Sequence, residues 1–451
     1  MASSAVDSKI FRDIFSTEAM RRIFSDESRI QLYLDIESAL ARAQASLGII
    51  PREAAMEIEK QARFEKFDME RLKKRTEIVG YPVLPVVEQL VKLCSNNLGE
   101  WAHWGATTQD ITDTAAVLQI REALALIDDD LRAICESLAS LARRYRDTPM
   151  AGRSNLQQAI PITFGFKMAV LLAAFDRHRT RLAELLPRIL VGEFGGAVGT
   201  LASLGVRGLE VQAALMRELG LGQPEIAWHT ARDSFAEVAC FLGLVTGTLG
   251  KIATDVKLMM QTEVSEVFEP FEQGRGSSST MPQKRNPISC NYILACTSVV
   301  RQHVAAFLEA MVEDHERSTG PWEIEWIVLP EIFLLASGAL SQARRMLAGL
   351  QVDEKRMRAN LDLTNGLIVS EAAMMGLAPY LGRQRAHDLV YDICRKVVQT
   401  GTPLIDLLAA EPEISRHLGR SDLAKLTDPA NYLGQAGEMI DRVLTRRSRP
   451  G

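Results

Sequence analysis

The sequence predicts an all-α fold with three helical domains around a central bundle of long helices. Two apolar stripes with helical spacing run through the middle of the chain, and further helical patterns cover roughly 162–190 and 288–312. No run of alternating β-branched residues is long enough for a sizeable sheet. Four polar segments interrupt the helices, and these segments are the candidates for function.

Both stripes repeat at alternating intervals of three and four residues, as in a helix packed along other helices. The first consists of Val117, Ile120, Leu124, Ile127, Leu131, Ile134, Leu138 and Leu141. The second consists of Val238, Leu242, Val245, Leu249, Ile252, Val256 and Met259. Gly247 and Gly250 interrupt the second helix, where a glycine costs about 1 kcal/mol, so we expect them to permit a close helix crossing.

Domain boundaries are expected where the helical patterns break. We expect an N-terminal helical domain at 1–105, a central long-helix bundle domain at 106–349 and a C-terminal helical domain at 350–451. Helices about 40 Å long present apolar faces that exceed what one protomer covers. We therefore expect oligomerisation through the bundle.

Composition and charge exclude several classes of function. The 451 residues include 52 Lys and Arg against 57 Asp and Glu, and the net charge of −5 gives no reason to expect nucleic acid as a partner. The six cysteines form no CxxC pair and no metal-ligand array, which is typical of reduced cytosolic thiols. No signal-peptide pattern is seen, and the longest apolar runs are too short for a membrane span. We expect a soluble cytoplasmic protein without a membrane partner.

The first polar segment, GATTQDITDT, places Thr107, Thr108, Gln109 and Asp110 just before the first stripe. An N-cap explains one or two of these residues. Four hydrogen-bonding side chains in a row also suit a helix N-terminus that holds a carboxylate. Both interpretations stay open at this point.

The second and third polar segments also precede helical patterns. GRSNLQQAIPITFG contains Ser154, Gln157 and Gln158, and a loop is the simplest structure for it. WHTARDSFAEV places His229 and Arg232 at the start of the second stripe. A lone histidine near a helix start is more often structural than catalytic.

The fourth polar segment, GRGSSSTMPQKRNP, spans 274–287. It is not a phosphate loop, because its glycines follow no strand and GxxxxGK[ST] is absent. The glycines before Ser278 allow movement, whereas two prolines hold Lys284 and Asn286 in fixed relation. A loop that is mobile in its first half and rigid in its second suits a lid that closes over a substrate.

Three of these segments together resemble the active-site regions of the fumarase/aspartase superfamily. SSTMPQKRNP resembles its signature, approximately G-S-S-x-M-P-x-K-x-N-P, and GATTQDITDT and GRSNLQQAIPIT are similar to its other two regions, in the same order. Within the superfamily the chain most resembles the 3-carboxy-cis,cis-muconate cycloisomerases, the lactonising enzymes of protocatechuate breakdown. The features shared with them are FGGAVGTLASLG, WHTARD, DHERSTGPWEIEW and NLDLTNGL, and VGYPVLPVV stands where an adenylosuccinate lyase would carry a His-Asp pair.

The resemblance implies a homotetramer in which the central helices form one multi-helix bundle and three chains build each active site. It implies a polycarboxylate substrate and no metal or organic cofactor. Carried over, Ser278 is the catalytic base, Lys284 and Asn286 bind the carboxylate that becomes an enediolate, and Thr107 and Thr108 hold a carboxylate.

Other polar residues of these segments are expected to bind substrate. They are Gln109, Ser154, Gln157, Gln158, His229, Arg232 and, in DHERSTGPW, Arg317. Arg317 suits bidentate pairing with a carboxylate, and an ion pair with a nearby glutamate is the alternative. A serine is a poor base unless its alkoxide is stabilised, which a helix N-terminus and Lys284 could do under a closed lid.

Two departures from the superfamily pattern narrow the chemistry. Fumarase-like members pair a His with a Glu where this chain has Asn155 and Asn291, and adenylosuccinate-lyase-like members carry a general-acid His where it has Gln158. Amides donate hydrogen bonds but cannot shuttle protons near neutral pH. A carboxylate or CO2 leaving group needs no general acid. His229, His315 or a residue of another subunit is the alternative acid.

We therefore expect a cycloisomerase, an intramolecular lyase that converts 3-carboxy-cis,cis-muconate or a similar unsaturated polycarboxylate to a lactone through an enediolate. The alternatives are a decarboxylase of an unsaturated tricarboxylate such as aconitate, and a fumarate-releasing C–N lyase of the adenylosuccinate or argininosuccinate type. A non-catalytic structural protein, as in the crystallins of this superfamily, is a further alternative. The intact Ser278, Lys284 and Asn286 speak against it.

Overall fold

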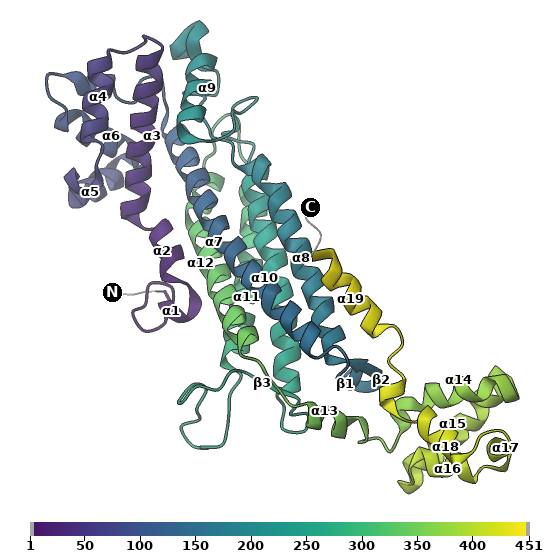
Figure 1. Cartoon of the computed structure of the whole chain (residues 1–451). Helices are drawn as coiled ribbons and strands as arrows, with labels where there is room; N and C mark the ends of the chain where they lie inside the picture. The colour runs from purple at the N-terminus through teal and green to yellow at the C-terminus, as the bar shows by residue number, and fades with distance from the viewer. Residues whose placement is uncertain (1–3, 448–451) are drawn as a thin grey trace. The chain divides into compact units, whose positions relative to one another are not determined.

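The chain folds into two helical units (Figure 1), and the structure, a computed structural model, describes residues 4–447. Unit 1 comprises residues 1–131, 178–250 and 292–342, and unit 2 comprises 132–177, 251–291 and 343–451. The helices that contribute residues to both units are α7 (Thr108–Arg144), α8 (Phe164–Ile189), α10 (Asp233–Met259), α11 (Ile288–Ala310) and α12 (Pro321–Ala348). The all-α prediction is confirmed, while the predicted division into three domains stays a prediction.

Both apolar stripes lie in the predicted helices. Every residue of the first stripe is buried in α7, and every residue of the second is buried in α10. Gly250 permits the expected close approach, because a Cβ there would lie 3.2 Å from Thr297 on α11. The expectation for Gly247 was wrong, since a Cβ there would meet no described atom within 4 Å.

The N-terminal part of unit 1 is a cluster of helices. They are α1 (Arg12–Phe15), α2 (Glu18–Ile23), α3 (Asp26–Ser46), α4 (Arg52–Gln61), α5 (Met69–Val79) and α6 (Val83–Leu93). Ser25 and Asp68 begin α3 and α5 by accepting backbone N–H groups that a helix start leaves free. Because α3 packs against α4 and also against α9 (Gly208–Leu219), it joins this cluster to the segment that follows α8.

Unit 2 contains two small sheets and the C-terminal helices. β1 (Pro149–Ser154) pairs antiparallel with β2 (Gln157–Thr163), and β3 (Val267–Phe268) pairs antiparallel with β4 (Gln351–Val352). The helices are α13 (Glu354–Leu361), α14 (Ser370–Leu381), α15 (Arg383–Thr400), α16 (Leu404–Ala410), α17 (Pro412–Ser415), α18 (Arg420–Leu426) and α19 (Ala436–Arg447). α14, α15, α16 and α18 contribute to a core of buried Leu, Ile, Val and Ala side chains.

The second polar segment is a hairpin and not the loop that the sequence suggested. Asn155 and Leu156 have φ angles of 49° and 63°, the left-handed conformation found in two-residue hairpin turns. Pro161 lies within β2 and is tolerated because both strands of a two-stranded sheet are edge strands. The hairpin escaped prediction because the turn lacks glycine and the residues that flank it are polar: Arg153, Ser154, Gln157 and Gln158.

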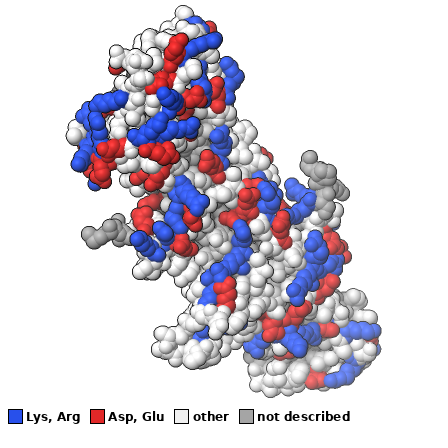
Figure 2. Space-filling model, turned by 60° about the vertical axis from the view of Figure 1, so that its left-hand side comes forward, with Lys and Arg blue, Asp and Glu red and all other residues white. Residues whose placement is uncertain are grey.

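α10 and α12 are long and apolar enough to cross a membrane by length and composition alone. However, 61% and 56% of their apolar windows are buried inside the protein, as expected for core helices. On the face drawn in Figure 2, Lys and Arg side chains are interspersed with Asp and Glu side chains. This face therefore presents no field of a single sign.

Val397→Ala is expected to lower the free energy of unfolding by about 2 kcal/mol, because it removes buried methyl groups and leaves a cavity. Val397 is 2% exposed in the core of unit 2, whereas the next residue, Val398, is 74% exposed and offers the matched control. Urea denaturation followed by circular dichroism measures both. Equal losses of unfolding free energy in Val397→Ala and Val398→Ala would contradict the burial of Val397 and the exposure of Val398 on α15.

Candidate active site

The first polar segment forms the start of α7 in unit 1. Thr108 is the first residue of the helix, and the backbone N–H of Thr107 donates to the carboxylate of Asp110 at 2.9 Å. The same carboxylate accepts the N–H groups of Gly195 and Gly196 at 2.8 and 3.0 Å. Asp110 therefore fixes the start of α7 against the glycine-rich segment FGGAVGTLASLG, while both threonines remain partly exposed.

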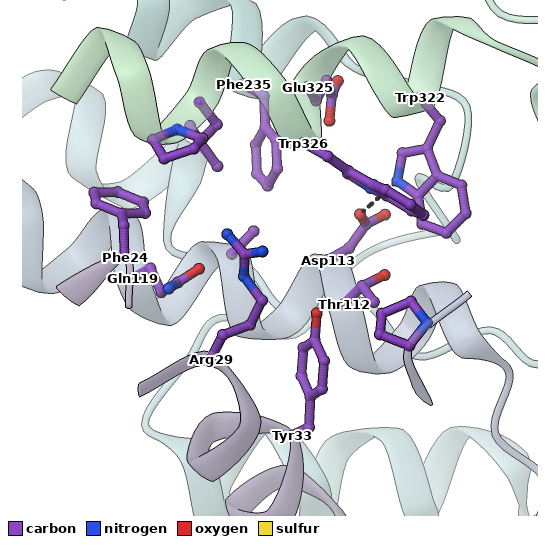
Figure 3. A pocket seen from close by; sticks show the side chains of 14 residues that line it. Phe24, Arg29, Tyr33, Thr112, Asp113, Gln119, Phe235, Trp322, Glu325 and Trp326 are labelled. Atoms are coloured by element: carbon purple, nitrogen blue, oxygen red, sulfur yellow. Dashed lines mark hydrogen bonds between the residues drawn. The ribbon is translucent and has the colours of Figure 1, made fainter. Parts of the chain in front are cut away.

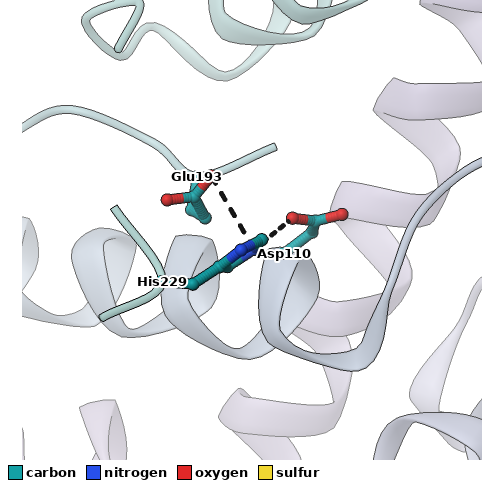
Figure 4. Close-up of side chains that lie close together, drawn as sticks. All are labelled: Asp110, Glu193 and His229. Carbon is teal, nitrogen blue, oxygen red and sulfur yellow. Dashed lines mark hydrogen bonds and ion pairs between the residues drawn. The ribbon is translucent and has the colours of Figure 1, made fainter. Parts of the chain in front are cut away.

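His229 lies between Asp110 and Glu193 (Figure 4), with its Nε2 2.8 Å from the former and 3.8 Å from the latter. Burial lowers the pKa of His229, but the hydrogen bond with Asp110 and the charge of Glu193 outweigh this, so the net pKa is raised. Burial also raises the pKa of Glu193 to about 7. This buried, charge-stabilised ring favours a structural role, and the predicted contact of His229 with substrate stays a prediction.

The ligand atoms of Asp110, Glu193 and His229 lie within 4.8 Å of one another, close enough for a metal ion. The hydrogen bonds of these side chains nevertheless disfavour a metal ion. Three backbone N–H groups and the His229 ring already direct hydrogen bonds at the two Asp110 oxygens, so a cation would face these donors. We interpret the cluster as a hydrogen-bonded anchor.

Gln109 and Arg317, two predicted substrate ligands, contact each other in unit 1. Arg317 donates to the Gln109 side-chain oxygen at 3.0 Å and to the carbonyl of Ala197 at 2.7 Å. The Gln109 amide donates in turn to Asp113 at 3.0 Å and to the carbonyl of His229 at 2.7 Å. Gln109 is thus buried and hydrogen-bonded inside the protein, whereas Arg317 is half-buried and has further N–H groups for a carboxylate.

Arg232 is buried between two carboxylates. Its guanidinium donates to Asp113 at 2.6 and 3.1 Å and to Glu325 at 3.0 and 2.5 Å. Burial lowers the pKa of Arg232, but the two carboxylates raise it more, so the side chain stays charged. Because its N–H groups are used internally, this geometry favours a structural role. Its predicted contact with substrate stays a prediction.

Glu313, in the loop between α11 and α12, is a buried acid that the sequence did not single out. Its side chain is 1% exposed, and its Oε1 lies 3.9 Å from Nε of Arg232. Neither carboxyl oxygen has a hydrogen-bond partner among the described residues. Burial raises the pKa of Glu313 to about 7, so the group carries a proton over much of the range below neutral pH.

A cavity of about 80 Å³ opens in unit 1 beside the Arg232 ion pairs (Figure 3). Aromatic side chains make up much of its wall: Phe24, Tyr33, Phe235, Trp322 and Trp326. Tyr81 stacks on Trp322 behind this wall, with ring centroids 5.9 Å apart. The cavity therefore suits a flat, partly apolar molecule.

Arg29 points into this cavity and pairs with no carboxylate among the described residues. Asp113 and Glu325 also line the cavity, and the single guanidinium of Arg232 pairs with both of them. The guanidinium of Arg29 therefore lies beside aromatic rings without an ion-pair partner of its own, while the four charged groups Arg29, Arg232, Asp113 and Glu325 balance one another. Its N–H groups suit a carboxylate, whose two oxygens match the fork of the guanidinium.

In unit 2 the hairpin carries three predicted substrate ligands. Ser154 and Gln157 are exposed and face each other across the strands. Gln158 donates to the carbonyl of Asn360 at 2.7 Å, and its side-chain oxygen is buried without a partner among the described residues. Asn155 lies exposed at the tip. The segment therefore offers hydroxyl and amide groups and no acid.

The fourth polar segment, the predicted lid at 274–287, lies in unit 2 and presents Ser278 in a tight turn. Its Oγ accepts the backbone N–H groups of Met281 at 3.0 Å and Thr280 at 3.3 Å. Two N–H groups directed at one hydroxyl oxygen favour its anionic form, as a serine base requires. Lys284 is exposed in the next turn.

Asn286 closes the base of the lid. Its backbone N–H and its side-chain amide donate to the carbonyl of Gly276 at 3.0 and 2.9 Å. Gly276 has a φ of 70°, and a Cβ there would lie 2.8 Å from the Asn286 carbonyl oxygen, so the position requires glycine. Arg285 anchors the same end by donating to the carbonyl of Glu269 at 2.8 Å. One N–H of the Asn286 side-chain amide is therefore used in this hydrogen bond. The second N–H of the same amide is left to bind a carboxylate.

Within unit 1 the structure brings together Gln109, His229, Arg232 and Arg317 through Asp113 and short hydrogen bonds. Within unit 2 the hairpin residues and the lid residues stand on separate segments. Sequence reasoning missed Glu193, Glu313 and Arg29. Arg29 and Glu313 stand among other polar residues, in SDESR and VEDHER, and therefore look like surface residues until packing shows that Glu313 is buried and that Arg29 lines a cavity.

Two family profiles match the chain. The lyase profile matches residues 14–301, and the profile of the adenylosuccinate lyase C-terminus matches residues 366–443. The chain belongs to the fumarase/aspartase superfamily of lyases. The superfamily resemblance seen in the sequence is thereby confirmed.

Similar members of the superfamily carry out different reactions. The chain is 58% identical to trans-aconitate decarboxylase 1 of Mycosarcoma maydis, covering 97% of this chain and 88% of that protein. It is 47% identical to the 3-carboxy-cis,cis-muconate cycloisomerase of Pseudomonas aeruginosa, covering 98% and 97%. The crystal structure of a fumarate lyase from a Mesorhizobium species is 54% identical, with a TM-score of 0.90 over 96% of this chain and 98% of that one.

Ser278→Ala is expected to lower kcat about 100- to 10,000-fold, the range attributed to a general acid or base. Ser279→Ala is the matched control, because it makes the same change one residue away on the exposed lid. Circular dichroism checks that both variants fold. Full activity in Ser278→Ala would remove this residue from the chemistry.

The free energy of unfolding is expected to fall between about pH 4.5 and pH 7 through Glu313, because the folded protein keeps a proton that the unfolded chain has lost. Glu313→Gln mimics the protonated acid and should lose less stability than wild type over this range. Urea denaturation at pH 5 and pH 8 measures the difference. Glu316→Gln, an exposed neighbour, should behave as wild type, and identical pH profiles for all three proteins would contradict the raised pKa.

Proposed function

We propose that this superfamily member converts an unsaturated polycarboxylate through an enediolate, with a leaving group that needs no general acid. The observation that carries this proposal is the Ser278 hydroxyl, which receives two backbone N–H groups on a lid that also bears Lys284 and Asn286. The amides of Asn155 and Gln158 support it, because they stand where related enzymes carry proton donors.

The first candidate reaction is cyclisation of 3-carboxy-cis,cis-muconate. A substrate carboxylate oxygen forms a C–O bond with the β-carbon of a double bond conjugated to another carboxylate. The π electrons move onto that second carboxylate and give the enediolate, which Lys284 and Asn286 stabilise as its charge develops. Ser278 then delivers a proton to the α-carbon, and in the reverse direction the same residue removes it.

The second candidate is decarboxylation of trans-aconitate, favoured by the 58% identity with a trans-aconitate decarboxylase. Here the C–C bond to the departing carboxylate breaks, and its electron pair enters the remaining conjugated carboxylate system. One proton returns to carbon, and CO2 leaves without protonation. The two candidates therefore need the same enediolate site and differ in which bond to carbon forms or breaks.

We propose that the aromatic cavity of unit 1 holds a non-reacting carboxylate through Arg29. The segment VGYPVLPVV stands where an adenylosuccinate lyase would carry a His-Asp pair, and Pro82 of this segment lines the cavity. Aromatic rings and one free guanidinium suit a small planar carboxylate better than a nucleotide phosphate and ribose. Adenylosuccinate is accordingly a poor candidate substrate.

We also propose a homotetramer with shared active sites. Exposed apolar side chains on the long helices of unit 1 support it: Leu244, Val299, Leu308 and Ile327, each 44–63% exposed. Apolar surface of this kind on a helix bundle favours contact with another subunit. The predicted contributions of the hairpin and the lid to active sites depend on this assembly.

A parallel assay of three substrate classes tests the proposed function. Purified protein should decrease the ultraviolet absorbance of 3-carboxy-cis,cis-muconate or release CO2 from trans-aconitate, and Ser278→Ala should do neither. Release of fumarate from argininosuccinate or adenylosuccinate would instead indicate C–N cleavage. Absence of turnover with every unsaturated polycarboxylate would contradict the proposal.

A further inference from the structure

The outer end of the hairpin needs support from elsewhere in unit 2. Arg153 pairs with Gln158 and Ser154 pairs with Gln157 in its register, and an irregularity interrupts the pairing between Ala151 and Arg153. A two-stranded hairpin in water is marginally stable at best. The exposed groups of Ser154 and Gln157 therefore keep a defined place only if the strands are anchored from outside.

Glu266 supplies such an anchor from the inside of the unit. Its carboxylate is fully buried and accepts hydrogen bonds from both terminal nitrogens of Arg153, at 2.8 and 2.7 Å. It also accepts the side-chain amide of Asn360 at 2.8 Å. A bidentate arginine–carboxylate pair fixes orientation as well as distance, so Glu266 sets the direction of β1 at Arg153.

Asn360 extends the anchor to the second strand. Its side-chain amide donates to Glu266 and to the carbonyl of Val264, both at 2.8 Å, and its backbone carbonyl accepts the amide of Gln158 at 2.7 Å. Gln158 faces Arg153 across the hairpin. Glu266 therefore holds both strands at this residue pair, β1 through Arg153 and β2 through Asn360. The contact also orients the Gln158 amide with its nitrogen towards Asn360.

The same short segment anchors the lid. Three residues after Glu266, the carboxylate of Glu269 accepts the N–H groups of Ser289 and Cys290 at 3.1 and 2.9 Å, where α11 begins behind the lid. The Glu269 carbonyl accepts the guanidinium of Arg285 at 2.8 Å. β3 lies between the two glutamates and is held by its pairing with β4. Residues 266–269 thus support both the hairpin and the lid.

We propose that Glu266 is a positioning residue for the reaction. It acts through Arg153 and Asn360 to set the place of Ser154, Gln157 and Gln158, and it touches no substrate. This inference rests on the proposed function, because it takes the hairpin as part of an active site. A displacement of about 1 Å at a substrate-positioning group lowers the rate about 100-fold.

Glu266→Gln tests the proposal, because it keeps the volume of the side chain but removes the charge that orients Arg153. We expect kcat/KM to fall about 100-fold with the substrate that wild type converts, and amide hydrogen exchange to increase in residues 149–163. Glu413→Gln is the matched control, since Glu413 also accepts two hydrogen bonds from one arginine, from Nε and a terminal nitrogen of Arg385, on the surface of unit 2. It should leave both quantities unchanged.

Arg153→Lys keeps a positive charge and removes the bidentate geometry, so it should reproduce the loss even if Glu266→Gln folds poorly. If the two residues act as one unit, the double variant should lose no more activity than the worse single variant. Wild-type kcat/KM and exchange in both folded single variants, or an equal loss in Glu413→Gln, would overturn the proposal. The exchange measurement needs no substrate, so its outcome stays separate from failure of the proposed function.

Discussion

Arg232 joins the N-terminal parts of three long helices in unit 1. It stands directly before α10 and pairs with Asp113 in α7 and with Glu325 in α12. Removing one partner of a buried ion pair typically costs about 3–5 kcal/mol, because the remaining charge stays uncompensated. The start of α7, which carries the first polar segment, is therefore held by charge pairing as well as by apolar packing.

Asp110 forms a second set of contacts at the start of α7. Its carboxylate collects the N–H groups of Thr107, Gly195 and Gly196 together with the His229 ring, so residues far apart in sequence meet at one buried anion. Such an arrangement leaves the threonine side chains at the surface of a rigid support. Rigid support of exposed polar groups is what binding of a carboxylate requires.

The chemistry of the superfamily explains how one scaffold serves several reactions. A decarboxylase, a cycloisomerase and a fumarate lyase all share extensive sequence with this chain. Each reaction can proceed through negative charge delocalised into a carboxylate, so the enediolate site proposed above is compatible with all of them. The proton donors on other segments then distinguish the leaving groups. In the proposed site of this chain, the amides of Asn155 and Gln158 can donate hydrogen bonds but cannot donate a proton near neutral pH.

The sequence by itself determined the long helices, the lid motif and the membership of the superfamily, because helical periodicity and short motifs are properties of neighbouring residues. Through the resemblance it also pointed to Asn155 and Gln158 as amides at positions where related enzymes are expected to carry proton donors. Only the tertiary structure decided which polar side chains are already hydrogen-bonded inside the protein. These include Gln109, His229 and Arg232. The hairpin, the place of Arg29 in the cavity and the anchor at Glu266 were likewise decided by packing. Burial and charge pairing depend on contacts between residues distant in the chain, as between Asp113 and Arg232. Patterns of neighbouring residues cannot predict such contacts.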